Sequence, residues 1–135
     1  ARYYGEARPI IEKAFGVERP DVARVLSNQG EVLWKLKRLD EAEPLLRQAL
    51  AIKVRLFKAG DPSIAISQNA LAGVLRDEGK MADAEVLYRQ AIAIREVAKS
   101  PTDLAESLRE YATLLRATSR TAEAEQLEQR ASSLK

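Results

Sequence analysis

The chain has 135 residues, with 22 Lys or Arg against 20 Asp or Glu, so its formal net charge is +2. This length fits one domain, and 46% hydrophobic with 31% charged residues is a globular composition. The sequence contains no Cys and no His, which excludes disulfides, thiolate nucleophiles, imidazole bases and the usual zinc ligands. Two surplus positive charges form a nucleic-acid surface only if they cluster on one face.

The sequence predicts neither a membrane span nor a secretory signal. No apolar stretch approaches the roughly 18 residues of a membrane span, and no signal peptide opens the chain. We therefore expect a cytoplasmic protein without membrane contact.

The sequence contains an internal repeat. Residues 40–52 align with residues 82–94, so that Ala42 meets Ala84 and Ala49 meets Ala91, each 42 positions later. A weaker copy has Ala124, 40 positions after Ala84, and another lies at the N-terminus, 35 positions before Ala42. The matching N-terminal residues are Tyr4, Ala7, Pro9, Ile10, Ile11 and Ala14. Repeats at such periods predict helix pairs that stack on one another.

Residues 1–19 are predicted to form a single helix of the second type, whose own first helix is missing from the chain. Its apolar residues include Tyr3, Tyr4 and Ile11. One hypothesis is that the chain comes from a longer array, and that these residues form an exposed patch for self-association. The alternative is that they pack onto Val22 and Leu26.

Three helix pairs follow, in residues 20–60, 61–100 and 101–135. Apolar residues at steps of three and four mark one face of each first helix, for example Ile64, Leu71 and Leu75. Asp61-Pro62 and Ser100-Pro101 predict helix starts with a capping side chain, and Gly79 predicts a turn with positive φ. Pro9 and Pro44 are predicted in the first turns of second helices. Tyr88 and Tyr111 fall on apolar stripes and are predicted in the core.

The last predicted helix, residues 121–134, has few large apolar residues besides Leu127 and Leu134. Its many charged residues suit a terminal helix with a solvent-facing side.

The second helices carry small residues seven positions apart with a large residue between them, as in Ala42–Leu46–Ala49 and Ala84–Tyr88–Ala91. This pattern resembles the tetratricopeptide repeat (TPR). The long period and strings such as Pro20-Asp21-Val22-Ala23 and Ala49-Leu50-Ala51-Ile52 resemble the kinesin-light-chain type of TPR. The resemblance covers essentially the whole chain. It implies an all-α, right-handed solenoid of seven helices, with the first helices of the pairs lining a concave groove.

Given that arrangement, the helical period predicts which side chains face the groove. Arg24, Asn28, Glu31 and Lys35 form one polar stripe opposite the leucines, with Trp34 at its edge. An Asn amide can pair with a peptide backbone, and an Arg can hold a carboxylate with two hydrogen bonds. The predicted peptide-binding residues are Arg24, Asn28, Glu31, Lys35, Asn69, Arg76, Arg109 and Arg116. The alternative is a merely solvated helix face, with Trp34 packed between repeats rather than anchoring a partner.

No enzyme signature is present, neither a Walker-type loop nor Gly-x-Gly-x-x-Gly, so we predict no catalysis, cofactor or metal. Carboxylates among the groove residues, such as Asp77 and Glu110, argue against nucleic acid. The predicted function is a protein-interaction scaffold that binds an extended or short helical segment of another protein. The alternative is a self-association module of a larger multidomain protein.

Overall fold

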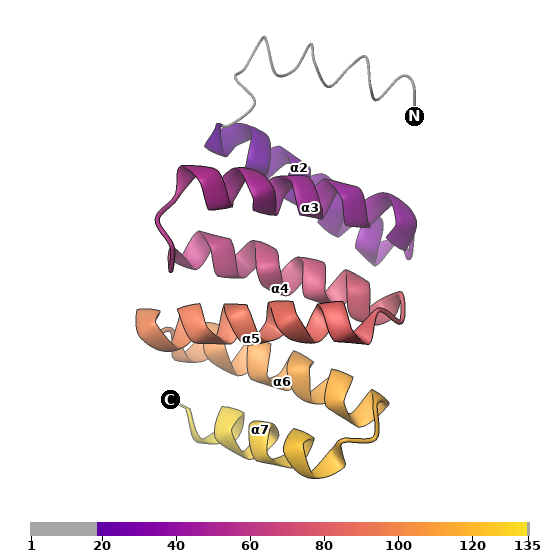
Figure 1. Ribbon diagram of the computed structural model, residues 1–135, viewed down its shortest axis with the longest axis vertical. Helices are drawn as coiled ribbons and strands as arrows, with labels where there is room; N and C mark the ends of the chain where they lie inside the picture. Colours follow the sequence, from indigo (N-terminus) through magenta and orange to yellow (C-terminus); the bar gives the residue numbers. More distant parts are fainter. Residues whose placement is uncertain (1–18, 135) are drawn as a thin grey trace.

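A computed structural model of the protein describes residues 19–134. These residues form helices and turns, without a strand among them. The helices are α2 (Pro20–Lys35), α3 (Leu39–Leu56), α4 (Pro62–Asp77), α5 (Met81–Ala98), α6 (Pro101–Ala117) and α7 (Thr121–Ser133). They stack in order from α2 to α7 (Figure 1).

The expected count of seven helices is not matched, because the described residues contain six. The remaining predicted helix was placed in residues 1–19. Tyr3, Tyr4, Pro9 and Ile11, on which predictions were made, all lie outside the described residues.

Each first helix has a proline in its first turn, where the missing N–H costs no hydrogen bond. The Asp61 side chain caps α4 by accepting a hydrogen bond of 2.8 Å from the Ser63 backbone N–H, as predicted. The corresponding prediction for Ser100 is wrong in one respect. Ser100 precedes α6, but its side chain makes no capping hydrogen bond.

Pro44 is not in the first turn of its helix. It lies inside α3, which begins at Leu39, so its ring takes the place of an N–H that would otherwise bond the Asp40 carbonyl. The helix continues through it to Leu56, and Ala42 and Leu46 on either side are fully buried. Packing of the helix against its neighbours therefore outweighs the local cost of the proline.

The turns inside the three pairs share one geometry. Lys37, Gly79 and Ser119 each have positive φ, of 65°, 84° and 64°. In each turn the next residue donates its N–H to a carbonyl five positions back, at 2.8 Å for Arg38, 2.8 Å for Lys80 and 2.7 Å for Arg120. This is the Schellman arrangement that ends many helices. The sequence signalled it only at Gly79.

One continuous core runs through all three pairs. The six alanines at seven-residue spacing in the described second helices are all buried. Tyr88 and Tyr111 are buried in the same core, as predicted, and their rings stack with centroids 6.1 Å apart. The members with no exposed surface at all include Ala42, Leu46, Val74, Ala84, Leu108 and Leu114.

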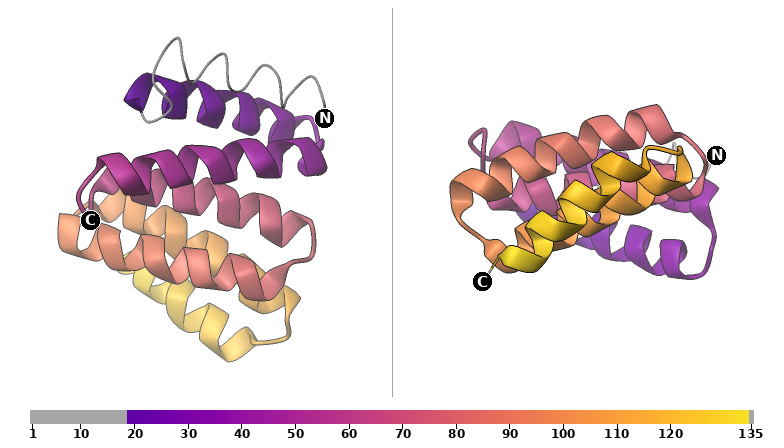
Figure 2. Two further views of the ribbon diagram at one scale, coloured as in Figure 1. Left: turned by 45° about the horizontal axis from the view of Figure 1, so that its top comes forward. Right: turned by 90° about the horizontal axis from the view of Figure 1, so that it is seen from below.

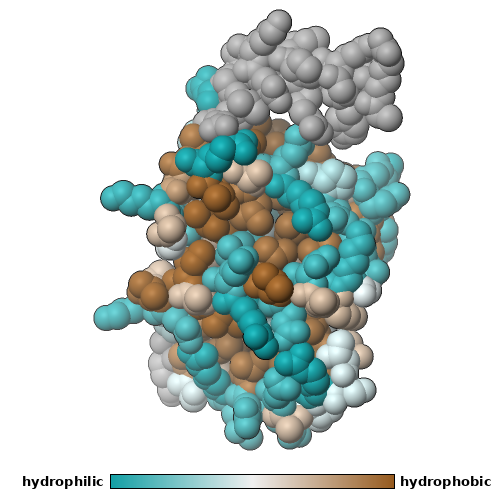
Figure 3. Space-filling view, in the orientation of Figure 1, coloured by the Kyte–Doolittle hydropathy of each residue, from teal (hydrophilic) through white to brown (hydrophobic). Residues whose placement is uncertain are grey.

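The helices form two rows. Each helix packs on its chain neighbours, and α4 additionally contacts both α2 and α6. A stack curves toward the row whose helices lie closer together, so α2, α4 and α6 line its inner side. The helices turn relative to one another down the stack (Figure 2). The face in Figure 3, over α3 and α5, intersperses apolar and charged side chains.

Candidate functional site: the inner surface of the first helices

The inner surface, formed by α2, α4 and α6, brings together most of the polar residues predicted to face a groove. On α2, Arg24, Asn28 and Lys35 are exposed and Glu31 is half-buried. Arg24 makes a loose ion pair of 3.8 Å with Asp21, on its own helix. Helix α2 therefore presents a row of polar side chains that make few contacts with the rest of the protein.

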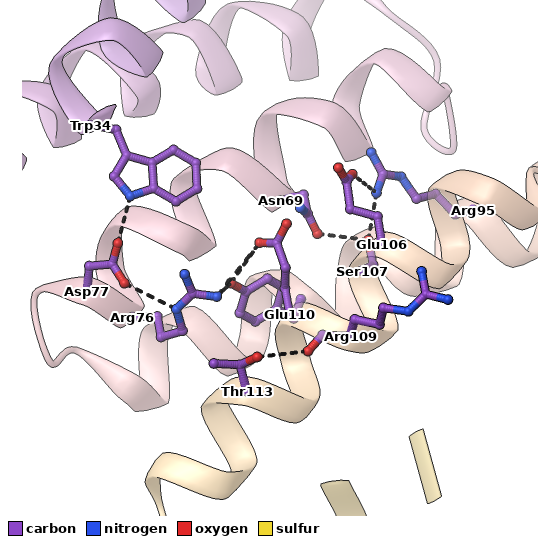
Figure 4. Close-up of polar contacts among 11 residues, drawn as sticks. Trp34, Asn69, Arg76, Asp77, Arg95, Glu106, Ser107, Arg109, Glu110 and Thr113 are labelled. Carbon is purple, nitrogen blue, oxygen red and sulfur yellow. Dashed lines mark hydrogen bonds and ion pairs between the residues drawn. The ribbon is translucent and has the colours of Figure 1, made fainter. Parts of the chain in front are cut away.

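Asn69, on α4, is placed differently from Asn28. Its side chain is buried, and its Oδ1 accepts a hydrogen bond of 2.8 Å from the Ser107 hydroxyl of α6. Ser107 in turn accepts a bond of 2.7 Å from Arg95, which reaches in from the end of α5 (Figure 4). Asn69 thus joins two repeats beneath the surface, and a direct contact of Asn69 with a peptide stays a prediction.

Arg76, also on α4, is held by a polar cluster at the junction with α6. Its Nη1 donates to the Tyr88 hydroxyl at 3.0 Å and lies 3.9 Å from a Glu110 carboxylate oxygen. Tyr88 donates to the same carboxylate at 3.2 Å. Burial raises the pKa of Glu110, although Arg76 partly opposes this, and burial raises the pKa of Tyr88 as well. The cluster fixes Arg76 with its guanidinium already occupied.

Trp34 lies at the edge of this surface, between α2 and α4. Its indole N–H donates to Asp77 at 2.7 Å (Figure 4), and its ring lies against Gly73. A Cβ at Gly73 would be only 2.2 Å from the nearest indole carbon. Trp34 is therefore packed between adjacent repeats, with part of its surface still open to solvent. Its role as an anchor for a partner stays a prediction.

On α6 the two predicted arginines differ in engagement. Arg116 makes a bidentate pair with Glu128 of α7, at 2.9 and 2.5 Å. Arg109 is exposed, and among residues 19–134 its guanidinium has no hydrogen-bond partner. The Thr113 hydroxyl, one turn on, donates to the Arg109 backbone carbonyl at 3.1 Å. Arg109 is thus available to an incoming segment in a way that Arg116 is not.

Two buried cations of this region were not predicted from the sequence. Lys53 and Arg95 occupy equivalent positions near the ends of α3 and α5 and are 8% and 4% exposed. A signal existed, because they are 42 residues apart and both interrupt the apolar faces of second helices. Whether each cation finds a partner depends on the residues that it faces, on α4 for Lys53 and on α6 for Arg95.

The comparisons with known proteins agree with this architecture. A family model described as tetratricopeptide repeat matches residues 1–53 and 63–135.

The chain belongs to the tetratricopeptide repeat family.

Solved structures place it among TPR proteins similar to kinesin light chain. BtubC (BKLC) from P. vanneervenii is 23% identical with a TM-score of 0.85, over 97% of this chain and 53% of that one. A Podosopora anserina protein described as kinesin light chain-like, with nearly identical TPR-like repeats, is 25% identical with a TM-score of 0.75, over 84% of this chain and 55% of that one. The chain thus spans little more than half the length of these structures. No curated protein sequence matches it.

The family resemblance expected from the alanine spacing is confirmed. TPR domains generally serve as protein–protein interaction scaffolds. None of the described helices, α2 to α7, has an apolar run long enough to cross a membrane.

Proposed function

We propose that this TPR domain binds an extended segment of a partner protein across the inner surface of α2, α4 and α6. The main support is how engaged and free side chains alternate on this surface. Asn28 and Lys35 of α2 and Arg109 of α6 are exposed, whereas Asn69 and Arg76 between them are tied into the framework. The free groups keep hydrogen-bonding capacity for a partner, which outweighs the ordering cost of about 0.5–1.5 kcal/mol per side chain only because the backbone that carries them is already rigid.

The chemistry of the free groups suits a peptide. The Asn28 amide offers a donor and an acceptor, the pair of groups that each peptide unit of an extended chain presents. Arg109 can hold a carboxylate or a row of carbonyl oxygens with its planar fork. Arg116 and Arg76 contribute to peptide binding only if a bound segment replaces the side chains with which they now pair.

The proposal is tested with a library of random twelve-residue peptides, blocked at both ends and selected on the wild-type domain. The affinity of selected peptides is then measured for a variant with Asn28→Ala and Arg109→Ala. We expect a loss of at least about tenfold, with the circular dichroism spectrum and melting temperature unchanged, because both side chains are exposed. A matched control replaces Lys58 and Gln126, exposed residues outside the three first helices, by Ala. Failure to select any peptide, or equal affinities for the two variants, would refute the proposal.

A second candidate function, self-association, is favoured by a different observation. Val32 and Leu36 of α2 are 56% and 59% exposed, and Val32 lines a pocket of about 470 Å³ between α2 and α3. Sedimentation velocity over a range of concentrations tests this candidate. A mass that rises with concentration for wild type and stays monomeric for Val32→Lys supports it, and a wild-type monomer throughout excludes it.

A further inference from the structure

The fold repeats one local arrangement at its two junctions between helix pairs. Near the end of α3, the Lys53 ammonium donates to the Ser63 backbone carbonyl in the first turn of α4, at 3.2 Å. Near the end of α5, Arg95 donates to the Asp103 carbonyl in the first turn of α6, at 2.9 Å. The two junctions are therefore structurally equivalent and can be compared position by position.

At the second junction the buried cation has three partners within the protein, the Asp103 carbonyl, Glu106 and Ser107. Arg95 pairs with the Glu106 carboxylate at 3.1 Å and donates to the Ser107 hydroxyl at 2.7 Å. Ser107 then donates to Asn69 at 2.8 Å (Figure 4). Arg95 thus pairs with a carboxylate of the inner surface, Glu106, and bonds to the Ser107 hydroxyl beneath it, which is itself bonded to the Asn69 amide.

At the first junction the same positions hold other residues. Ile66 stands where Glu106 stands, so the carboxylate is missing, and Lys53 forms no ion pair with any of residues 19–134. Ser27 stands where Asn69 stands. The hydroxyls of Ser27 and Ser67 are both buried without a hydrogen-bond partner among the described residues. The first junction is therefore an incomplete copy of the second.

A pocket of about 340 Å³ lies over this incomplete junction. Lys53 and Ser27, both more than nine-tenths buried, line it together with Phe57 and the half-exposed Ile66. Burial lowers the pKa of Lys53, an effect that the charges of Glu31 and Asp61 partly oppose. A buried cation with free donors, beside an orphan hydroxyl and an apolar wall, is suited to an anion on a short aliphatic stem.

We propose that this pocket binds a glutamate side chain of the partner segment. Its carboxylate pairs with Lys53, as Glu106 pairs with Arg95, and its methylene groups lie against Ile66 and Phe57. Two carboxylates that also line the pocket, Glu31 and Asp21, oppose the incoming charge and weaken this contact, whereas Arg24 on the same lining favours it. The proposal rests on the proposed function, since it names the chemistry that one part of the inner surface recognises.

The decisive variant is Ile66→Glu, which supplies the missing carboxylate from the protein itself. Peptides selected on wild type from the end-blocked library are expected to contain an enriched Glu. Ile66→Glu should weaken their binding at least tenfold and raise the melting temperature, because it completes the junction. The matched control is Val86→Glu, which adds the same charge at an exposed valine on α5 (55% exposed) and should leave both unchanged. Glu31→Gln should tighten binding several-fold.

Pairing of the two groups is measured by a double-mutant cycle, with Glu→Gln in the peptide and Lys53→Met in the protein. We expect the Glu→Gln loss, at least tenfold on wild type, to disappear on Lys53→Met. Should Lys53→Met unfold, the Ile66→Glu and Glu31→Gln results decide.

Several outcomes would overturn the inference. If selected peptides lack an acidic preference, or Ile66→Glu binds them as wild type does, the pocket is not a glutamate site. The proposed function still stands in that case, provided that the Asn28 and Arg109 variant loses affinity. Binding that requires an unblocked C-terminal carboxylate would also overturn the glutamate assignment. If no peptide is selected at all, both proposals fail.

Discussion

Replacing Gly73 by alanine should destabilise the domain only while Trp34 is present. The added Cβ would lie 2.2 and 2.3 Å from two carbons of the indole ring, far inside van der Waals contact. The ring must therefore tilt away, which also disturbs its 2.7 Å hydrogen bond to Asp77. Overpacking of this kind costs about 1–3 kcal/mol.

The higher helix propensity of alanine acts in the opposite direction and raises the free energy of unfolding. Gly73 lies inside α4, where alanine is more favourable than glycine by about 1 kcal/mol. Because Trp34 is only partly buried and its ring can shift toward solvent, we take the middle of the overpacking range, about 2 kcal/mol, and not its upper end. Gly73→Ala should then destabilise the wild type by roughly 1 kcal/mol, but stabilise a Trp34→Ala variant by up to about 1 kcal/mol. The coupling energy is about 2 kcal/mol.

The measurement is urea denaturation of the four proteins of the cycle, followed by far-UV circular dichroism. Since Trp34 is the only tryptophan, its fluorescence reports separately on displacement of the ring. We expect Gly73→Ala to shift the emission toward longer wavelength. Equal stabilisation by Gly73→Ala in both backgrounds, with unchanged emission, would show that the ring does not rest on this glycine.

Two further predictions concern other parts of the framework. Lys37→Gly should stabilise the domain by about 0.5–1 kcal/mol in the same denaturation assay, because Lys37 has the positive φ that glycine adopts without strain, and an unchanged or lower stability would contradict this. The pKa of Glu43 is lowered to about 2, chiefly by its hydrogen bond from Lys80. Its contribution to stability is present above its ordinary pKa of 4.5 and is lost as pH falls toward 2. Glu43→Gln should therefore flatten the acid limb of stability between these values, and an acid limb as steep as that of wild type would refute the assignment.

The fold could be predicted from the sequence because its signals are local or periodic. Alanines seven positions apart and prolines at helix starts are local signals, and the 42-residue period is a regular one. The family match confirms the TPR fold that they indicated. Pro44 shows where local reasoning fails. Its helix begins five residues earlier than proline rules favour, because tertiary packing buries Ala42 and Leu46 beside it.

The sequence predicted which surface forms the candidate site, but not which of its side chains are exposed and which are bonded within the protein. Asn28 and Asn69 both lie on first helices, yet one is exposed and the other bonded to Ser107 beneath the surface. Arg109 and Arg116 also share a helix, and only Arg116 meets a glutamate of α7. The position of a residue along a helix predicts the direction in which its side chain points. It does not predict how deeply the next helix buries that side chain.

By itself, then, the order of residues determined which segments are helical, how they pair and how often the unit recurs, because these properties follow from short-range geometry and spacing. Only the tertiary structure decided which polar groups are engaged, from the indole of Trp34 on Gly73 to the partnered Arg95 and the Lys53 that lacks a carboxylate. The physical reason is that hydrogen bonds and ion pairs require contact within a few ångströms. That contact is set by the rotation and distance of helices whose residues are some forty positions apart.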